Sequence, residues 1–274
     1  MTEIKKLDIE DAELESFLEK VFMVYKVDFR QYGKAHLKRR IRHRMTFAKY
    51  ENMIQLKEDV LQNKAAFEKL FEDLSINVTE LFRDPQFYES LQQFLVQMPS
   101  TKPIKIWVSA CASGEEAFSM LMMLEHFEIP YESILATDFN PQIVERASTG
   151  KMETIYMKEY LKNMAATRFD IDFYKFFDFK QDYYQLKSKY LDKIQFKVHN
   201  LMDEPDFDPF DVILCRNVLI YFEKELQDRV VNLLTKQLTK GGLLCLGAKE
   251  SLRFMSNFQD YLSIHQNHKI YQKK

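Results

Sequence analysis

Two apolar runs, each followed by small or acidic residues, constrain this chain more than any other feature of its sequence. The first, Ile104–Val108, breaks at the small-residue segment ACASG, after which a helical pattern opens with Glu115 and Glu116. The second, Ile134–Thr137, ends in Asp138. In an open α/β sheet, ligands bind beyond the carboxyl ends of the strands, where small residues let the backbone approach closely. An acid at the end of the second strand suits ribose hydroxyls. The pattern therefore predicts an α/β domain that holds a nucleoside-containing cofactor.

The two acids after the turn indicate which cofactor fits. A dinucleotide site is expected to carry G-x-G-x-x-G and a helix N-terminus left free for pyrophosphate. The turn between the first strand and the helix contains a single glycine, Gly114. Carboxylates in the first helical turn satisfy the helix dipole and repel phosphate. S-adenosylmethionine fits better, because it carries an ammonium, a sulfonium and a ribose but no phosphate. An ordinary strand–turn–helix unit with acids at the helix start is the alternative.

The composition predicts a folded protein without a dominant charge. Of 274 residues, 46% are hydrophobic and 14% aromatic, which is ample for a core, and the net charge of −2 gives no global argument for nucleic-acid or membrane binding. The apolar runs are too short to span a bilayer, and the acidic N-terminus lacks the apolar region of a signal peptide, so we expect a cytoplasmic protein. The six histidines form no ligand-spaced pair, so we predict no metal. We expect buried, reduced thiols at Cys111, Cys215 and Cys245.

The N-terminal region, residues 1–75, has helical periodicity and segregated charge. Its first nineteen residues hold seven acids against two lysines, whereas residues 20–50 hold ten basic residues against the single acid Asp28. Within GKAHLKRRIRHRM one face is apolar, with Leu37, Ile41 and Met45. The basic residues that lie away from this line are Arg39, Arg40, Arg42 and His43. Because the helix itself supplies no acids to offset like charges at i,i+4, we predict a surface for an anionic partner. Nucleic acid and an acidic protein helix are both candidates, and a solvated helix face is the alternative.

Beyond residue 76, strand and helix patterns alternate, which predicts a mainly parallel sheet with right-handed crossovers. Asp84-Pro85 is expected to cap a helix that runs to about Met98, before a loop from Pro99 to Pro103. A second helix is expected from Asn140-Pro141 to Gly150. Further strands are expected over 194–199, 211–215 and 243–247, the last after a turn at Gly241-Gly242. Residues 151–193 are rich in Tyr and Phe, and their alternation around FFDFKQDYYQL predicts a small antiparallel β insert.

Six segments resemble, in order, the motifs of the CheR-type chemotaxis receptor methyltransferases. They are SINVTELFRD (75–84), WVSACASGEEAFS (107–119), LATDFN (135–140), HNL (199–201), FDVILCRNVLIYF (210–222) and GGLLCLGAKESL (241–252). The resemblance implies an α/β, Rossmann-like S-adenosylmethionine-dependent methyltransferase domain (76–274) with a small antiparallel β insert, preceded by an all-α N-terminal domain (1–75). It also implies methyl transfer to glutamate side chains of a chemoreceptor's cytoplasmic helical bundle, giving glutamyl methyl esters and S-adenosylhomocysteine.

By position, the resemblance implies cofactor contacts at Asn77, Thr79, Arg83, Glu115, Asp138, Asn200, Leu201, Arg216 and Asn217. Residue chemistry agrees with these positions. The Arg83 fork suits the methionyl carboxylate, Glu115 suits the ammonium and Asp138 suits the ribose hydroxyls. Arg83 and Tyr221 are expected to act in catalysis, Tyr221 through a hydrogen bond near the transferring methyl group.

The expected chemistry needs little from the protein besides orientation, because a glutamate carboxylate is already ionised at neutral pH. One alternative is a methyltransferase acting on RNA or a small molecule, although the N/D-P-P-Y/F motif of amine methylation is absent. Another is a non-catalytic S-adenosylmethionine-binding signalling module. We expect a monomer that does not insert into the membrane, with the receptor favoured over nucleic acid as its partner. The insert lacks the glycine-rich turn with which some family members dock a receptor peptide, so peptide tethering is not expected.

Overall fold

The computed structural model describes residues 8–75, 77–98 and 102–274, and these form two compact units. The helical unit holds the described residues up to Ser75 together with Tyr221–Leu226, and the sheet unit holds the rest. Parts of three expectations lie outside the described residues: the acids before residue 8, the domain boundary at residue 76 and most of the loop that starts at Pro99. Within the described residues no helix is both long and apolar enough to span a bilayer.

Four helices form the helical unit: α1 (Asp11–Tyr25), α2 (Lys34–Ala48), α3 (Met53–Gln62) and α4 (Lys64–Leu74). Asn52 and Asn63 cap the last two, each accepting a backbone N–H with its side-chain oxygen. The apolar line of α2 is buried as expected. The inclusion of residues 221–226 was not predicted. Backbone hydrogen bonds attach that segment, since Gly33 donates to Tyr221 and Glu223 donates to Gln31.

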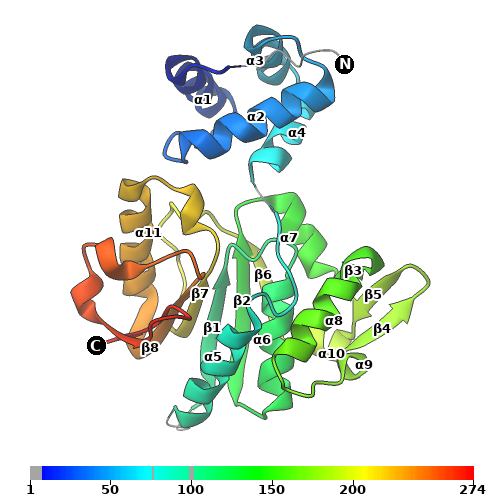
Figure 1. The fold of residues 1–274 in the computed structure, drawn as a ribbon, viewed down its shortest axis with the longest axis vertical. Coiled ribbons are helices and arrows are strands. Elements are labelled where there is room, and N and C mark those ends of the chain that lie inside the picture. The colour runs from blue at the N-terminus through cyan, green and yellow to red at the C-terminus, as the bar shows by residue number, and fades with distance from the viewer. Residues whose placement is uncertain (1–7, 76, 99–101) are drawn as a thin grey trace. The chain divides into compact units, whose positions relative to one another are not determined.

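A seven-stranded sheet organises the other unit, in the order β6-β2-β1-β7-β8-β10-β9 (Figure 1). Its parallel strands are β1 (Ile104–Ser109), β2 (Tyr131–Asp138), β6 (Ile194–Val198), β7 (Phe210–Cys215) and β8 (Leu238–Leu246). The antiparallel pair β9 (Tyr261–His265) and β10 (Ile270–Lys273) extends the β8 side. This hairpin was not predicted, because its short strands lack a continuous apolar run.

Side-chain alternation along the strands divides the core between the two faces of the sheet. Ile106 and Val108 belong to one large cluster with apolar residues of α5 (Pro85–Gln97) and α6 (Glu115–His126). Trp107 points to the other face, where it contacts Phe207 and Phe210. Two further helices are α7 (Pro141–Ser148), which starts after Asn140 as predicted and is capped by its side chain, and α11 (Lys224–Gln237) beside β7 and β8 (Figure 1).

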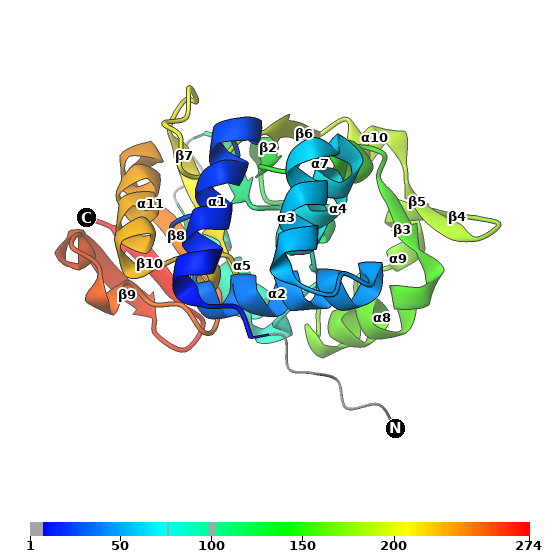
Figure 2. The ribbon, with the colours of Figure 1, turned by 90° about the horizontal axis from the view of Figure 1, so that it is seen from above.

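The insert forms a separate antiparallel sheet with strand order β3-β5-β4, made by Lys151–Glu153, Tyr183–Leu186 and Phe177–Lys180. The short helices around it are η1 (Thr154–Tyr156), α8 (Met157–Ala166), α9 (Phe173–Phe176) and α10 (Ser188–Leu191). Buried Phe176 packs on Tyr190 at a centroid distance of 4.7 Å and ties the insert to the core. Figure 2 shows this sheet and the β9–β10 hairpin at opposite ends of the unit. The predicted fold, a Rossmann-like domain with an antiparallel insert after an all-α domain, is confirmed.

Two local predictions were wrong. Asp84 precedes α5, but its side chain caps nothing, because the residue adopts a left-handed backbone and its carboxylate binds Arg216 instead. Gly241-Gly242 does not precede the last parallel strand. It lies inside β8, where the register against β7 shifts so that Phe210 pairs with Leu238 and Val212 with Leu243. A bulge with Gly241 at φ +79° replaces the expected turn. Short 3₁₀ turns, η2 (Leu219–Tyr221), η3 (Leu252–Phe254) and η4 (Phe258–Asp260), complete the described elements.

Candidate functional site

Most of the predicted site residues follow the carboxyl ends of neighbouring parallel strands. Ser109 of β1 lies opposite both Thr137 of β2 and Cys215 of β7, and Asp138 lies opposite Val198 of β6. The residues that continue each strand therefore emerge at one edge of the sheet. These are the turn 110–114, the segment 199–201 and the pair Arg216-Asn217.

Several residues at this edge have a left-handed backbone. Ala110, Ala112 and Gly114 all have positive φ, at 53°, 47° and 99°, and so does Asn217 at 61°. In the segment before α5, Phe82 and Asp84 share this conformation. Left-handed non-glycine residues are costly and are typical of functional sites, where the surrounding structure holds them. The hydrogen bond from the N–H of Cys111 to Thr137 and that from the N–H of Ala112 to Asp138 hold the turn here.

Glu115 begins α6 and is buried, with 5% of its surface exposed. Its Oε2 accepts from the Ser113 hydroxyl at 2.6 Å, and its Oε1 accepts from the Tyr160 hydroxyl at 3.1 Å. Burial raises the pKa of this carboxyl above its ordinary value. The described ion pairs give Glu115 no cationic partner. The carboxylate is thus oriented by two neutral donors and has a charge left to pair with a ligand.

Glu116 has a different role from its neighbour. Its Oε1 accepts from the guanidinium of Arg216 at 2.6 Å, and the same guanidinium binds the Asp84 carboxylate at 2.8 Å and the carbonyl of Arg83 at 3.2 Å. The Arg216 side chain is only 1% exposed and lies over the Phe87 ring. The expectation that both acids after the turn suit a ligand is therefore wrong for Glu116. Arg216 holds the segment before α5 against the sheet, and a direct cofactor contact by Arg216 stays a prediction.

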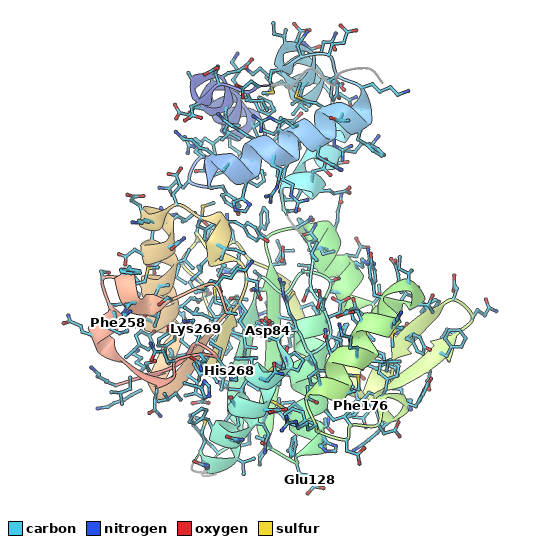
Figure 3. The ribbon with its side chains drawn as sticks, in the orientation of Figure 1. Asp84, Glu128, Phe176, Phe258, His268 and Lys269 are labelled. Carbon is cyan, nitrogen blue, oxygen red and sulfur yellow. The ribbon has the colours of Figure 1, made fainter. Side chains whose placement is uncertain are left out.

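The segment before α5 presents Arg83 as a half-buried cation. Its backbone is held from both sides, because its carbonyl binds Arg216 and its N–H donates to Glu80. Its guanidinium has no ion pair among the described residues, although it acts electrostatically on Glu116. The next residue, Asp84, acts electrostatically on His268 of the β9–β10 hairpin, and Figure 3 labels both side chains. Arg83 is therefore a fixed but uncompensated positive charge beside the strand ends.

Asp138 links the turn to the next segment. One carboxylate oxygen accepts from the N–H of Ala112 and the other from the N–H of Asn140, both at 3.0 Å. The backbone of Phe139 also hydrogen-bonds to this carboxylate, and the lone pairs that the three donors leave can accept from ribose hydroxyls. The Asp138 carbonyl accepts from His199, which places Asn200 and buried Leu201 next to it. The Asn200 side chain forms a local turn by accepting from the N–H of Met202.

Comparisons with known proteins decide the family. The model of the CheR methyltransferase S-adenosylmethionine-binding domain matches residues 77–269, and that of the CheR all-alpha domain matches residues 12–75. The chain belongs to the CheR methyltransferase family. It is 33% identical to Cher3 of Pseudomonas putida, over 96% of this chain and 97% of that protein. It is 30% identical to the chemotaxis protein methyltransferases of Vibrio parahaemolyticus (92% of both chains) and Listeria monocytogenes (82% of this chain, 85% of that one). This CheR protein is therefore an S-adenosylmethionine-dependent methyltransferase.

The structure brings some predicted residues of this CheR methyltransferase together and leaves others apart. Glu115, Asp138, Asn200, Leu201, Arg216 and Asn217 lie at the one sheet edge, and Arg83 is tied to it through Arg216. Asn77 and Thr79 lie half-buried in the segment that leads to Arg83. Tyr221 belongs to the helical unit, where its ring packs edge-on against His36 at 5.1 Å. Its catalytic role stays a prediction.

Three residues around the site were missed by sequence reasoning. Tyr160 and Asn163 lie on α8, where Tyr160 binds Glu115 and Asn163 donates to Glu80 and to the Leu81 carbonyl. Their spacing indicates only an amphipathic helix, so no local signal marked them. The third, Glu250, accepts several backbone N–H groups from the loop that carries Asn217. It lies within the family segment GGLLCLGAKESL, where a lone acid after an apolar strand was the available signal.

Proposed function

We propose that this protein transfers a methyl group from S-adenosylmethionine to glutamate side-chain carboxylates in the cytoplasmic helical bundle of a chemoreceptor. The products are glutamyl methyl esters and S-adenosylhomocysteine. The observation that carries the proposal is that a buried carboxylate at the sheet edge, Glu115, and a cation on the adjoining segment, Arg83, both lack an ion pair among the described residues. Relatives of similar length that are named chemotaxis protein methyltransferases support the substrate class.

The residues present fit the cofactor group by group. Glu115 would take the ammonium and Arg83 the carboxylate of the methionyl part, in two opposite charge pairs. Asp138 would accept from the ribose hydroxyls with the lone pairs that its backbone donors leave. Asn200 and Leu201 offer one polar and one apolar contact for the adenine. Asn217 has a buried Oδ1 that accepts no hydrogen bond from the described residues, which suits a ligand donor. Asn77 and Thr79 would complete the cofactor contacts.

The proposed reaction asks the protein for orientation and exclusion of water. The bound cofactor supplies a methyl group on a sulfonium, which leaves in an in-line displacement. The acceptor carboxylate is ionised at neutral pH, so no side chain has to remove a proton. Arg83 would hold the methionyl end in place, and Tyr221 would hydrogen-bond near the transferring group. Fixing reactants in this way is worth several kcal/mol, on the order of 7 or more in well-oriented systems.

The partner proposed for α2 is an acidic receptor helix. Arg39, Arg40, Arg42 and His43 would form its docking surface. Fewer basic residues support this surface than the charge run alone indicated, because α1 and the residues just before it supply acids. Lys38 pairs with Asp11, and Arg42 pairs with Asp8. Arg39 and His43 remain exposed, and no acid pairs with them in the described part of the helical unit. The proposal also places the enzyme in the cytoplasm as a monomer.

Methyl transfer from labelled S-adenosylmethionine to a chemoreceptor cytoplasmic fragment tests the proposal. We expect label in the fragment that mild base releases, because esters hydrolyse there and N-methyl groups do not. An Asp138→Ala variant serves as the inactive control, and a matched RNA sample as the competing substrate. Base-stable label, label in the RNA, or cofactor binding without any transfer would each overturn the proposal.

A further inference from the structure

A buried carboxylate organises the loop that follows β7. Glu250 is 5% exposed and comes from the loop after β8. Its Oε2 accepts from the N–H of Gly247 at 2.6 Å and from the N–H of Asn217 at 2.9 Å. Its Oε1 accepts from the N–H of Leu219 at 2.8 Å and, at the longer distance of 3.4 Å, from that of Ile220. One side chain therefore collects the backbone donors of two adjacent loops.

The loop held in this way carries Asn217 in a strained conformation. Its φ of 61° lies in the left-handed region, and its N–H points at Glu250. Gly247 closes the arrangement, because a Cβ there would come within 2.8 Å of the backbone nitrogen and Nδ2 of Asn217 and of the Glu250 carboxylate. The side-chain amide of Asn217 therefore packs closely against Gly247. Its Oδ1 is buried and accepts no hydrogen bond from the described residues.

Both side-chain oxygens of residue 250 have to accept hydrogen bonds. All the groups facing Glu250 are N–H donors, and none of the described ion pairs involves it. A carboxylate accepts at both oxygens, whereas the amide of a glutamine would turn an NH₂ group toward N–H donors. A buried charge balanced by backbone dipoles rather than by a cation is expensive. Such an arrangement is expected where geometry matters more than stability.

We infer that Glu250 is a positioning residue: by binding the loop backbone it orients the Asn217 amide so that Oδ1 faces the cofactor. The inference rests on the proposed cofactor site for the identity of the ligand. It does not depend on which substrate is methylated. If Glu250 merely stabilised the fold, its substitution would lower the stability of the protein, and its effect on cofactor binding would be independent of Asn217.

A double-mutant cycle on S-adenosylhomocysteine binding tests the inference, using calorimetry on the full chain with no receptor present. Glu250→Gln and Asn217→Ala should each weaken binding by about tenfold. The double variant should bind no more than about threefold more weakly than Asn217→Ala alone, because both changes remove the same contact. Asp211→Asn is the matched control. Asp211 is also buried and accepts a backbone N–H, from Lys105, but it lies at the opposite end of β7. That control should lose stability and keep its affinity.

The inference would be overturned if the double variant lost affinity by the product of the two single losses, or if folded Glu250→Gln kept wild-type affinity. If Glu250→Gln does not fold, Gly247→Ala replaces it, because the added methyl crowds both Asn217 and the Glu250 carboxylate and so disturbs the same contact. We then expect weaker binding that Asn217→Ala partly relieves, and losses that multiply would again count against the inference. Tight binding in the wild type combined with no receptor methylation would contradict the proposed function and leave this inference standing.

Discussion

At the scale of single residues, the site is defined by which charges are already paired inside the protein. Glu115 and Glu116 are adjacent and both are buried, yet among the described residues only Glu116 forms an ion pair. Arg216 binds two carboxylates in the interior, whereas Arg83, half-buried, has no ion pair among the described residues. We therefore expect Glu115 and Arg83, rather than Glu116 and Arg216, to bind the charged groups of the ligand.

Glu115 should make cofactor binding depend on pH. Burial raises the pKa of its carboxyl above 4.5, and only the charged form pairs with an ammonium. Affinity for S-adenosylhomocysteine should therefore rise as the pH increases through this raised pKa, with proton release on binding. Calorimetry from about pH 5 to about pH 8, in buffers of different ionisation enthalpy, would measure both effects. Glu115→Gln should bind more weakly and lose this dependence; an unchanged pH profile in that variant would assign the titration to another group.

Arg83→Ala should lose most activity while the protein stays folded. The lost bidentate contact is worth about 2–3 kcal/mol of cofactor affinity. Arg83→Lys should recover only part of it, because an ammonium cannot reproduce the fork. Arg253→Ala, at an exposed arginine of the same unit, is the control. If turnover and cofactor affinity of Arg83→Ala both match the wild type, Arg83 is an ordinary surface residue.

At the scale of secondary-structure elements, the site is made by connections at strand ends. The turn between β1 and α6, the segment before α5 and the loop after β7 all contain left-handed residues. Hydrogen bonds and ion pairs from neighbouring elements hold each one. The strands bring the connections to a common edge of the sheet, and these hydrogen bonds and ion pairs fix the conformation of each connection.

Gly114 should be far less replaceable than Gly241, although both have positive φ. Alanine at Gly241 meets nothing within 4 Å, so we expect a loss of about 1–2 kcal/mol in the free energy of unfolding from the backbone alone. At Gly114 a Cβ would lie 2.9 Å from Cζ of Phe118, which should add about 1–3 kcal/mol of overpacking. Urea unfolding of the two variants compares them. Equal losses would mean that the turn yields without strain.

The ion pair between Glu116 and Arg216 should be a strong determinant of stability. Glu116→Gln leaves a buried guanidinium with less compensation, so we expect a loss of about 3–5 kcal/mol in the free energy of unfolding. Glu204→Gln breaks the pair with Lys236, whose side chains are 79% and 66% exposed, and should cost less than about 1 kcal/mol. Chemical denaturation without cofactor measures both. Similar small losses would indicate that water reaches Arg216.

At the scale of the whole molecule, charge is distributed unevenly although it nearly cancels. The net charge of −2 hides an acidic N-terminal segment followed by a basic stretch. In the helical unit much of that basic charge is paired: Lys34 binds Glu15, Lys38 binds Asp11 and Arg44 binds Asp73. What remains for a partner is a small exposed group on α2 rather than the whole helix.

Charge reversal at Arg39 should therefore weaken receptor binding selectively. We expect Arg39→Glu to raise the apparent KM for the receptor fragment several-fold, about fivefold, at low salt, and to leave cofactor affinity unchanged. The difference should shrink as salt rises, since the Debye length is about 8 Å at physiological ionic strength. Lys64→Glu makes the same charge change at an 81% exposed lysine of α4 and is the control. Equal effects of the two variants would indicate net charge rather than a docking surface.

The sequence by itself determined the architecture and the composition of the site. Apolar runs ending in small or acidic residues predicted β1 and β2, strand-like runs predicted β6 and β7, and the Tyr- and Phe-rich alternation predicted the insert sheet. These features are local, because a strand's burial and a turn's residue types are written in a few consecutive positions. The family motifs added the list of expected cofactor contacts, of which Glu115, Asp138 and Asn217 lie at one edge.

Only the tertiary structure decided how the charges are paired. Arg216 meets Glu116, 100 positions earlier in the chain, and Asp84, 132 positions earlier. Glu250 reaches Asn217 across 33 positions, and Tyr160 reaches Glu115 across 45. No periodicity or spacing encodes such contacts, because they depend on which strands become neighbours. For the same reason the acids that offset α2 could not be assigned from its own sequence. Residue type sets which charges a chain carries, and packing decides which of them remain for a ligand.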